Sequence, residues 1–268
     1  SVTVKQSDRE KLIKMATNKA RITIKQKVKK ARAKNIICDI KGKGVDDNLV
    51  IVGAHYDTVA HSPGASDNGG GTATVLKVAE YFSKHIPQRY LRLVLFSGEE
   101  LGLLGSQAFV EKHKKELKKR CQIMVNVDVS GDTVGFDVAK IIGTKELSGY
   151  FDGLSKEIGL AFYTDVDIYS SDSIPFSKYE IPSVNILRQG GIGSFYIHTP
   201  QDSIKNISKR GLDNTVKATI NFLNHILNSK IFPCRKSIDE TLREKLEKYL
   251  WNLNFEKPEL EWEPKYKK

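Results

Sequence analysis

The sequence predicts an α/β fold in which a mixed, mostly parallel central sheet is flanked by helices. One observation is that continuous apolar runs, which suit strands buried on both faces, alternate with segments whose apolar residues recur at helical spacing. Strands joined by crossover helices lie parallel in one sheet. The other observation is that the chain has 268 residues, of which 40% are hydrophobic. This is enough apolar surface for a core and excludes disorder throughout the chain.

The first half of the chain contains three expected strands and two expected helices. Leu49–Ala54 is an unbroken apolar run, and the strand Asn35–Ile40 precedes it across a turn. Thr72–Ile86 carries an apolar stripe at helical spacing, and it is followed by the strand Leu91–Phe96. Leu103–Leu117 predicts a second helix, whose lysine-rich end suits the negative end of the helix dipole.

The second half repeats the alternation of strands and helices. Gln122–Val129 is an apolar strand, and Leu147–Ile158 is helical. Phe162–Ile168 and Ser183–Leu187 are the next expected strands. A long helix then follows, marked by apolar residues at helical spacing: Leu212, Val216, Ile220, Leu223 and Leu227.

These elements divide the chain into three parts. Residues 1–34 form a basic N-terminal segment, and residues 35–230 form the main α/β domain. Residues 231–268 form an appendage with an amphipathic helix over Leu242–Leu253 and several aromatic residues, which we expect to pack on the main domain. Because the chain begins with Ser1 rather than Met, we expect that a leader has been removed or that the chain is part of a longer protein.

The net charge of +11 invites a nucleic-acid-binding hypothesis, but the excess charge is local. Residues 1–34 contain twelve Lys or Arg and two acidic residues, so the rest of the chain is nearly neutral. Ile22, Ile24 and Val28 alternate there with cationic residues, which predicts a half-buried strand with a solvated lysine face. A patch for anionic polymers is the alternative. No aromatic stacking platform accompanies the lysines, so we expect no nucleic-acid partner.

Cysteine usage and hydropathy exclude further classes of protein. Cys38, Cys121 and Cys234 are scattered without a Cys-x-x-Cys pair, which excludes a disulfide scaffold and a zinc ribbon. No apolar run approaches the ~20 residues of a membrane helix, so we expect no membrane span. No signal-peptide pattern opens the chain.

Metal-binding side chains follow three of the expected strands or lie between elements. His55 and Asp57 come directly after Leu49–Ala54, and residues two apart on extended chain face the same side. Asp57 can therefore orient His55 as a ligand by accepting its free ring N–H. Asp128 lies within an apolar run, where an unpaired carboxylate would be costly to bury. His198 lies in a loop before the long helix.

Two further acidic motifs add to these residues. Asp67 lies in the glycine-rich turn Gly64–Gly71, which has no phosphate-binding P-loop signature and whose central acid favours a cation. Glu99 and Glu100 follow Leu91–Phe96. One of two adjacent acids can bind a metal while the other faces the substrate as a proton carrier.

The candidate ligands are of the types that zinc or a similar divalent ion prefers: His55, Asp67, Glu100, Asp128 and His198. Their number suits two metals that share one carboxylate. Open α/β sheets bind ligands at the carboxyl ends of their strands, where these residues are expected.

The motifs, in their order, resemble those of the co-catalytic dizinc aminopeptidases, typified by bacterial leucyl aminopeptidases and their secreted relatives. They are His-x-Asp, Gly-x-x-Asp-Asn-Gly, Gly-Glu-Glu-Leu-Gly-Leu-x-Gly-Ser, Asn-x-Asp and His-Thr-x-x-Asp, and they lie between Asn35 and Leu227. Ser171–Phe176 is similar to the family's Ser-Asp-His-x-Pro-Phe segment, with Ser173 where His is common. Residues 1–34 resemble the end of a protease-associated domain. The resemblance favours a secreted or cell-envelope location.

The resemblance implies the zinc-exopeptidase fold, two zinc ions, and a peptide substrate with a free N-terminus. Asp67 would bridge the ions, and the peptide bond after it would be cis. His55 and Asp128 would complete one site, while Glu100 and His198 would complete the other.

The resemblance also implies that Glu99 is the general base. We assign Asp57, which orients His55, to the catalytic residues together with Glu99. Tyr196 and Ser173 are candidates for substrate binding. Two rivals remain: a glutaminyl cyclase with one zinc, and a non-catalytic receptor-like homologue.

Overall fold

The computed structural model describes residues 4–252 except 17–18, 20, 24 and 26–30, in two compact units, Ser1–Arg32 and Ala33–Lys268. The first unit contains a 3-10 turn, η1 (Gln6–Asp8), and a short helix, α1 (Arg9–Lys14). The strand expected around Ile22 is not found at residues 21–23 and 25, and Ile22 is 65% exposed. The other positions of that expected strand lie outside the described residues.

The second unit is built on one seven-stranded sheet with the order β1-β3-β2-β4-β7-β5-β6. Neighbouring strands are parallel except in the pairs β1–β3 and β5–β7. The prediction of a mixed, mostly parallel sheet is therefore confirmed. The strands are β1 (Ile36–Ile40), β2 (Leu49–His55), β3 (Tyr90–Phe96), β4 (Cys121–Val127), β5 (Phe136–Ile142), β6 (Phe162–Asp165) and β7 (Ser183–Gln189).

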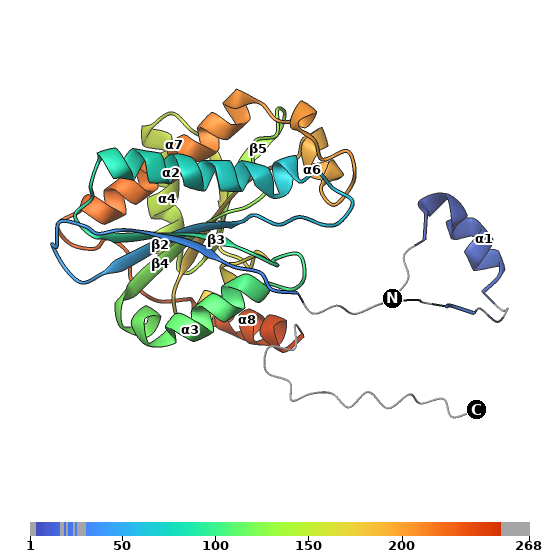
Figure 1. The fold of residues 1–268 in the computed structure, drawn as a ribbon, viewed down its shortest axis with the longest axis horizontal. Helices are drawn as coiled ribbons and strands as arrows, with labels where there is room; N and C mark the ends of the chain where they lie inside the picture. The colour runs from blue at the N-terminus through green and yellow to red at the C-terminus, as the bar shows by residue number, and fades with distance from the viewer. Residues whose placement is uncertain (1–3, 17–18, 20, 24, 26–30, 253–268) are drawn as a thin grey trace. The chain divides into compact units, whose positions relative to one another are not determined.

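Helices cover both faces of the sheet, with α2, α4 and α7 on one side and α3 and α8 on the other (Figure 1). The short helical elements α5, α6, η2 and η3 lie in the connections. The helical elements of this unit are η2 (Ala65–Gly70), α2 (Gly71–Lys84), α3 (Leu104–Arg120), α4 (Lys145–Glu157), α5 (Ile174–Ser177), α6 (Ile192–Tyr196), η3 (Ile204–Asn206), α7 (Lys209–Asn228) and α8 (Glu240–Asn252).

The alternation of side chains along β2 explains the two helical layers. Val50 and Val52 point into the core formed with α2, α4 and α7, whereas Leu49 and Ile51 point into the core formed with α3. Every residue of β2 is buried, as the unbroken apolar run predicts.

Two strands differ from the expectation. β5 lies between β7 and β6 and was not expected from the sequence. β6 ends at Asp165, so residues 166–168 are outside the sheet although a strand was expected through Ile168.

A third apolar cluster joins α8 to the main domain. Leu242, Leu246 and Leu250 of α8 are buried together with Leu103 and Ile174. The helix expected in the C-terminal appendage is thus part of the packed unit. Among the described residues, no helix has the length and apolar character needed to cross a bilayer.

Candidate metal centre

The site begins at His55, the last residue of the buried strand β2. His55 Nε2 lies 3.2 Å from Asp67 Oδ1 and 3.2 Å from Asp128 Oδ1. Asp128 follows directly after β4, which pairs in parallel with β2, so both residues emerge at the same edge of the sheet. These three side chains form a buried group that can hold a metal ion.

A second group lies on the other side of Asp67. His198 Nε2 lies 3.0 Å from Asp67 Oδ2 and 3.0 Å from Glu100 Oε2. The two oxygens of the Asp67 carboxylate therefore face different histidines. Each group can hold one ion, and Asp67 is the member that both groups share.

Hydrogen bonds to its neighbours fix the backbone around Asp67. The Asp202 carboxylate accepts from the main-chain N–H of Ser66 at 2.8 Å and of Asp67 at 3.1 Å. The Asn68 side chain donates to the Val127 carbonyl at 2.9 Å, which ties the loop to the end of β4. The peptide bond between Asp67 and Asn68 is cis, which confirms the sequence prediction.

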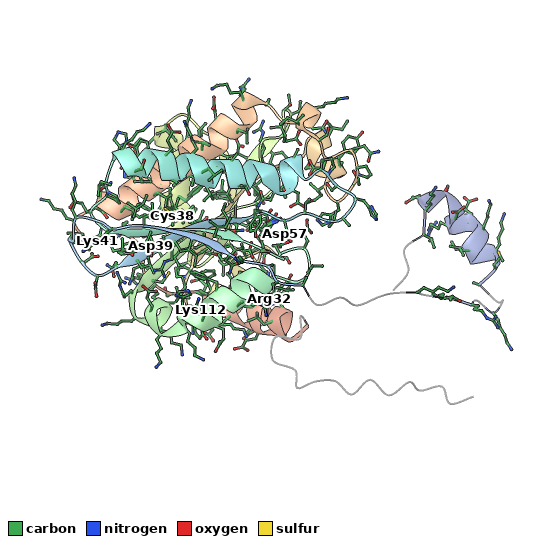
Figure 2. All side chains as sticks on the ribbon, in the orientation of Figure 1. Arg32, Cys38, Asp39, Lys41, Asp57 and Lys112 are labelled. Atoms are coloured by element: carbon green, nitrogen blue, oxygen red, sulfur yellow. The ribbon has the colours of Figure 1, made fainter. Side chains whose placement is uncertain are left out.

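Asp57 supports the site differently from the expectation. His55 Nδ1 lies 3.0 Å from the main-chain oxygen of Asp57 and 3.8 Å from its carboxylate, so the carbonyl orients the ring. The carboxylate instead accepts the main-chain N–H groups of Glu99 at 3.2 Å and Glu100 at 3.3 Å. Asp57 therefore holds the two glutamates. Figure 2 shows Asp57 at one end of the sheet and Lys41 at the other.

Glu99 belongs to neither ligand group, although it lines the same cavity as Glu100. Burial raises the pKa of Glu99 to about 9, and the charges of Asp128, Asp172 and Glu100 act in the same direction against that of His55. A carboxyl group with a raised pKa next to a metal site can accept and return a proton.

The carboxyl groups gathered at the centre shift the pKa values of one another and of His55. Burial lowers the pKa of His55, but its contacts with Asp128 and Asp67 outweigh burial and raise the pKa to about 12. Burial also raises the pKa of Glu100, as does the charge of Asp67, and Glu100 Oε1 has no hydrogen-bond partner. Imidazole and carboxylate groups are the ligands that zinc and similar divalent cations bind. The buried Glu100 oxygen without a hydrogen-bond partner is also consistent with a bound cation.

Both groups open into a cavity of about 350 Å³. The members of the two groups and Glu99 line it, and the other lining residues are Gly102, Leu103, Val129, Tyr169, Ser170 and Ile197. The mixture of apolar walls and convergent polar groups is typical of a small-ligand site.

The structure does not bring the two candidate substrate-binding residues into this cavity. Ser173 is fully buried, and its hydroxyl donates to Asn185 Oδ1 at 2.6 Å. Tyr196 ends α6 and is not among the residues that line the cavity, whereas its neighbours Ile197 and His198 are. Both remain candidates from the sequence, and in this structure neither side chain lines the cavity.

Sequence reasoning missed two residues of the site. Asp202 is the last residue of the His-Thr-x-x-Asp motif, so a signal was present, but its role in holding the Asp67 loop needs the fold. Tyr169 lines the cavity, and no motif marks it. Its pKa is raised well above the usual value, first by burial and then by the charges of Asp128 and Asp67.

Comparison with known proteins identifies the family. The model of peptidase family M28 matches residues 35–223. The chain belongs to peptidase family M28. The aminopeptidase YwaD of Bacillus subtilis is 32% identical over 224 residues, which cover 79% of this chain and 48% of YwaD.

Solved structures of two aminopeptidases have the same architecture. A zinc aminopeptidase from Bacillus subtilis superposes with a TM-score of 0.67 at 28% identity, over 78% of this chain and 53% of that structure. An aminopeptidase from Aneurinibacillus sp. strain AM-1 gives a TM-score of 0.66 at 26% identity, over 74% of this chain and 49% of its own. The chain spans about half the length of these relatives.

One structural neighbour bears on the rival interpretation. A glutaminyl cyclase from an Acidobacteriales bacterium gives a TM-score of 0.60 at 23% identity, over 71% of this chain and 73% of that structure. At this identity the likeness extends to the fold alone.

Proposed function

We propose that this M28 chain is a metal-dependent aminopeptidase that removes N-terminal residues from peptides, using water held between two zinc ions. The observation that carries the proposal is the position of Asp67, whose two oxygens face His55 and His198 separately. A carboxylate placed in this way is suited to bridge two metals. The relatives named above are aminopeptidases, and one is described as a zinc aminopeptidase.

The ligands divide between two ions in this proposal. His55 and Asp128 would hold one ion, Glu100 and His198 would hold the other, and Asp67 would contact both. Two bound divalent ions would supply an acidified water at neutral pH and an electrophile for the scissile carbonyl oxygen.

The protein's own residues then move the proton. Glu99 accepts a proton from the attacking water as the new C–O bond forms at the carbonyl carbon. The protonated Glu99 gives this proton to the leaving amine as the C–N bond breaks, so the side chain returns to its starting state. Asp57 keeps Glu99 and Glu100 in place through their main-chain N–H groups.

The cavity favours short, apolar N-terminal side chains. Its volume of about 350 Å³ is near the lower end of the ~300–1,000 Å³ range of small-ligand sites. Leu103, Val129 and Ile197 provide apolar walls. We infer that the substrate is the free N-terminal end of a peptide, with one side chain held in the cavity.

A panel of substrates tests the proposal. Aminoacyl-anilides, N-acetylated peptides and peptides with N-terminal Gln are incubated with the protein, with and without added zinc. We expect hydrolysis of the aminoacyl-anilides, dependent on zinc, and none of the acetylated peptides. Cyclisation of N-terminal Gln without hydrolysis would favour the cyclase rival, and zinc binding without any turnover would favour the receptor-like one.

A further inference from the structure

The helix α8 lies directly behind the walls of the cavity, although it is outside the family match at residues 35–223. Its buried leucines share one apolar cluster with Leu103, which lines the cavity. Ile168 and Tyr249 pack against the same cluster. One face of α8 therefore contacts Leu103, which lines the cavity, and Ile168, which precedes the lining residue Tyr169.

The wall formed by Tyr169 and Ser170 has little support from the sheet. The ladder between β5 and β6 ends at the pair Lys140 and Asp165, and α5 begins only at Ile174. The segment 166–170 therefore crosses to the cavity outside the sheet. Side-chain contacts must hold it, because it lacks the ladder of hydrogen bonds that fixes a strand. One of these contacts is the hydrogen bond between the Tyr169 hydroxyl and the Asp128 carboxylate.

α8 supplies polar contacts to this segment as well. The hydroxyl of Tyr249 forms a hydrogen bond with Ser170 Oγ. Lys245 Nζ lies 3.2 Å from Asp167 Oδ1, with the two side chains 61% and 41% exposed. An ion pair this exposed contributes little, and the Tyr249–Ser170 bond is exposed as well, so the leucine cluster is the main contact and the Tyr249 hydroxyl adds a directional one.

Leu103, which lines another part of the cavity, also packs against α8. Leu103 adopts φ 59° and is 3% exposed. A non-glycine residue in this region needs surrounding contacts to hold it. The main-chain N–H of Leu103 donates to the Glu99 carbonyl at 2.8 Å, and its side chain packs with the α8 leucines. Leu103 directly precedes α3 and lies three residues after Glu100.

We propose that α8 is a positioning element of the active site, and that it sets substrate selectivity by holding Tyr169 against the cavity. The expected change in substrate selectivity rests on the proposed aminopeptidase function. The expected change in hydrogen exchange of residues 166–170 does not. Tyr169 is the residue that would contact the N-terminal side chain. Leu246 and Tyr249 act through it as positioning residues.

The test uses three variants of the whole chain: Tyr249→Phe, Leu246→Ala and the conservative Leu246→Met. Lys248→Ala is the matched control, because Lys248 lies on the exposed side of α8. Hydrogen exchange is measured on peptides covering residues 166–170, and KM and kcat are measured with leucyl- and alanyl-anilides.

We expect Tyr249→Phe and Leu246→Ala to speed exchange in residues 166–170. KM for the leucyl substrate should rise about fivefold, the size of one lost hydrogen bond, with kcat within about twofold and zinc content unchanged. The ratio of leucyl to alanyl kcat/KM should fall. Leu246→Met and the control Lys248→Ala should both keep the wild-type exchange rate and the wild-type ratio of leucyl to alanyl kcat/KM.

The outcomes separate this inference from the proposed function. Faster exchange in the variants of a protein that hydrolyses none of the substrates would support the positioning role and reject the aminopeptidase assignment. An active wild type whose Tyr249→Phe variant keeps normal exchange and normal leucyl-to-alanyl selectivity would overturn the positioning role. Loss of activity only in proportion to unfolded protein would overturn it too.

Discussion

Asp67 presents its two oxygens to different histidines, and the adjacent residues Glu99 and Glu100 take different positions beside it. Glu100 Oε2 lies beside His198, and Glu99 lines the cavity without joining a ligand group. Two side chains of the same type therefore differ through geometry alone. This difference can be tested by matched substitutions.

We expect Glu99→Gln to retain both metals and to bind substrate normally, because no ligand is lost. The value of kcat should fall by about 10²–10⁴-fold with little change in KM, because the proton transfer matters only in the transition state. Glu100→Gln is the matched variant, and it should lose zinc, with activity partly recovered at high zinc concentration. Zinc content and kinetics of both purified proteins check this. Near-normal kcat in Glu99→Gln with two metals bound would refute the assignment of Glu99 as proton carrier.

Asp57 gives a second prediction at the scale of one residue. Asp57→Asn replaces one accepting oxygen with an NH₂ group, which cannot accept from Glu99 or Glu100. We expect zinc affinity or kcat/KM to fall by about 10–100-fold, as for other residues that support metal ligands. Asp47→Asn, at an 83% exposed side chain, is the control. If both variants behave alike, Asp57 does not hold the glutamates.

At the scale of elements, the edge strand β1 is attached to β3 by a charged cross-strand pair. Asp39 lies opposite Arg92 in the ladder, and its two oxygens accept from Arg92 at 2.7 and 3.0 Å. Burial raises the pKa of Asp39, but the hydrogen bonds and charge of Arg92 outweigh burial and lower it from 3.8. A lowered pKa means that the carboxylate stabilises the fold above pH 3.8 and that this contribution is lost as the pH falls further.

We therefore expect Asp39→Asn to reduce the free energy of unfolding by about 1 kcal/mol at pH 7, a modest value because the carboxylate is partly screened by solvent. The difference from the wild type should shrink below the unfolded pKa of 3.8. Urea unfolding at pH 7 and at about pH 3 measures it. A difference that is the same at both pH values would contradict a charge-based contribution.

The elements also show how far the sequence can be interpreted alone. β2 was predictable because its apolar run is unbroken, and the motifs after β2, β3 and β4 predicted which residues meet. β5 was missed because Asp137 and Lys140 interrupt its apolar pattern. Their partners, Arg188 and Asp165, come from neighbouring strands that only the fold reveals.

The remaining differences concern residues whose position depends on packing between distant segments. Ser173 is a candidate for substrate contact from its motif, but its buried hydroxyl donates to Asn185 Oδ1 and does not line the cavity. Tyr169 lies in the cavity because the chain leaves the sheet after Asp165 and α8 covers the segment from behind. The spacing of residues along the sequence does not predict contacts of this kind between distant segments.

At the scale of the whole molecule, the described sheet, its two helical layers and the metal centre lie within one compact unit, Ala33–Lys268. The ligands come from the ends of β2, β3 and β4 and from two loops that the sheet holds together. Among the described residues, all members of both ligand groups therefore belong to this unit.

The number of zinc ions bound at saturation tests the central claim most directly. Metal-free protein is titrated with zinc by calorimetry, and the bound metal is counted after removal of the excess. The shared position of Asp67 predicts two ions per chain, and it predicts that Asp67→Ala weakens both while an exposed control, Asp47→Ala, keeps both. One ion per chain at saturation, or loss of only one ion in Asp67→Ala, would contradict the bridged two-metal centre.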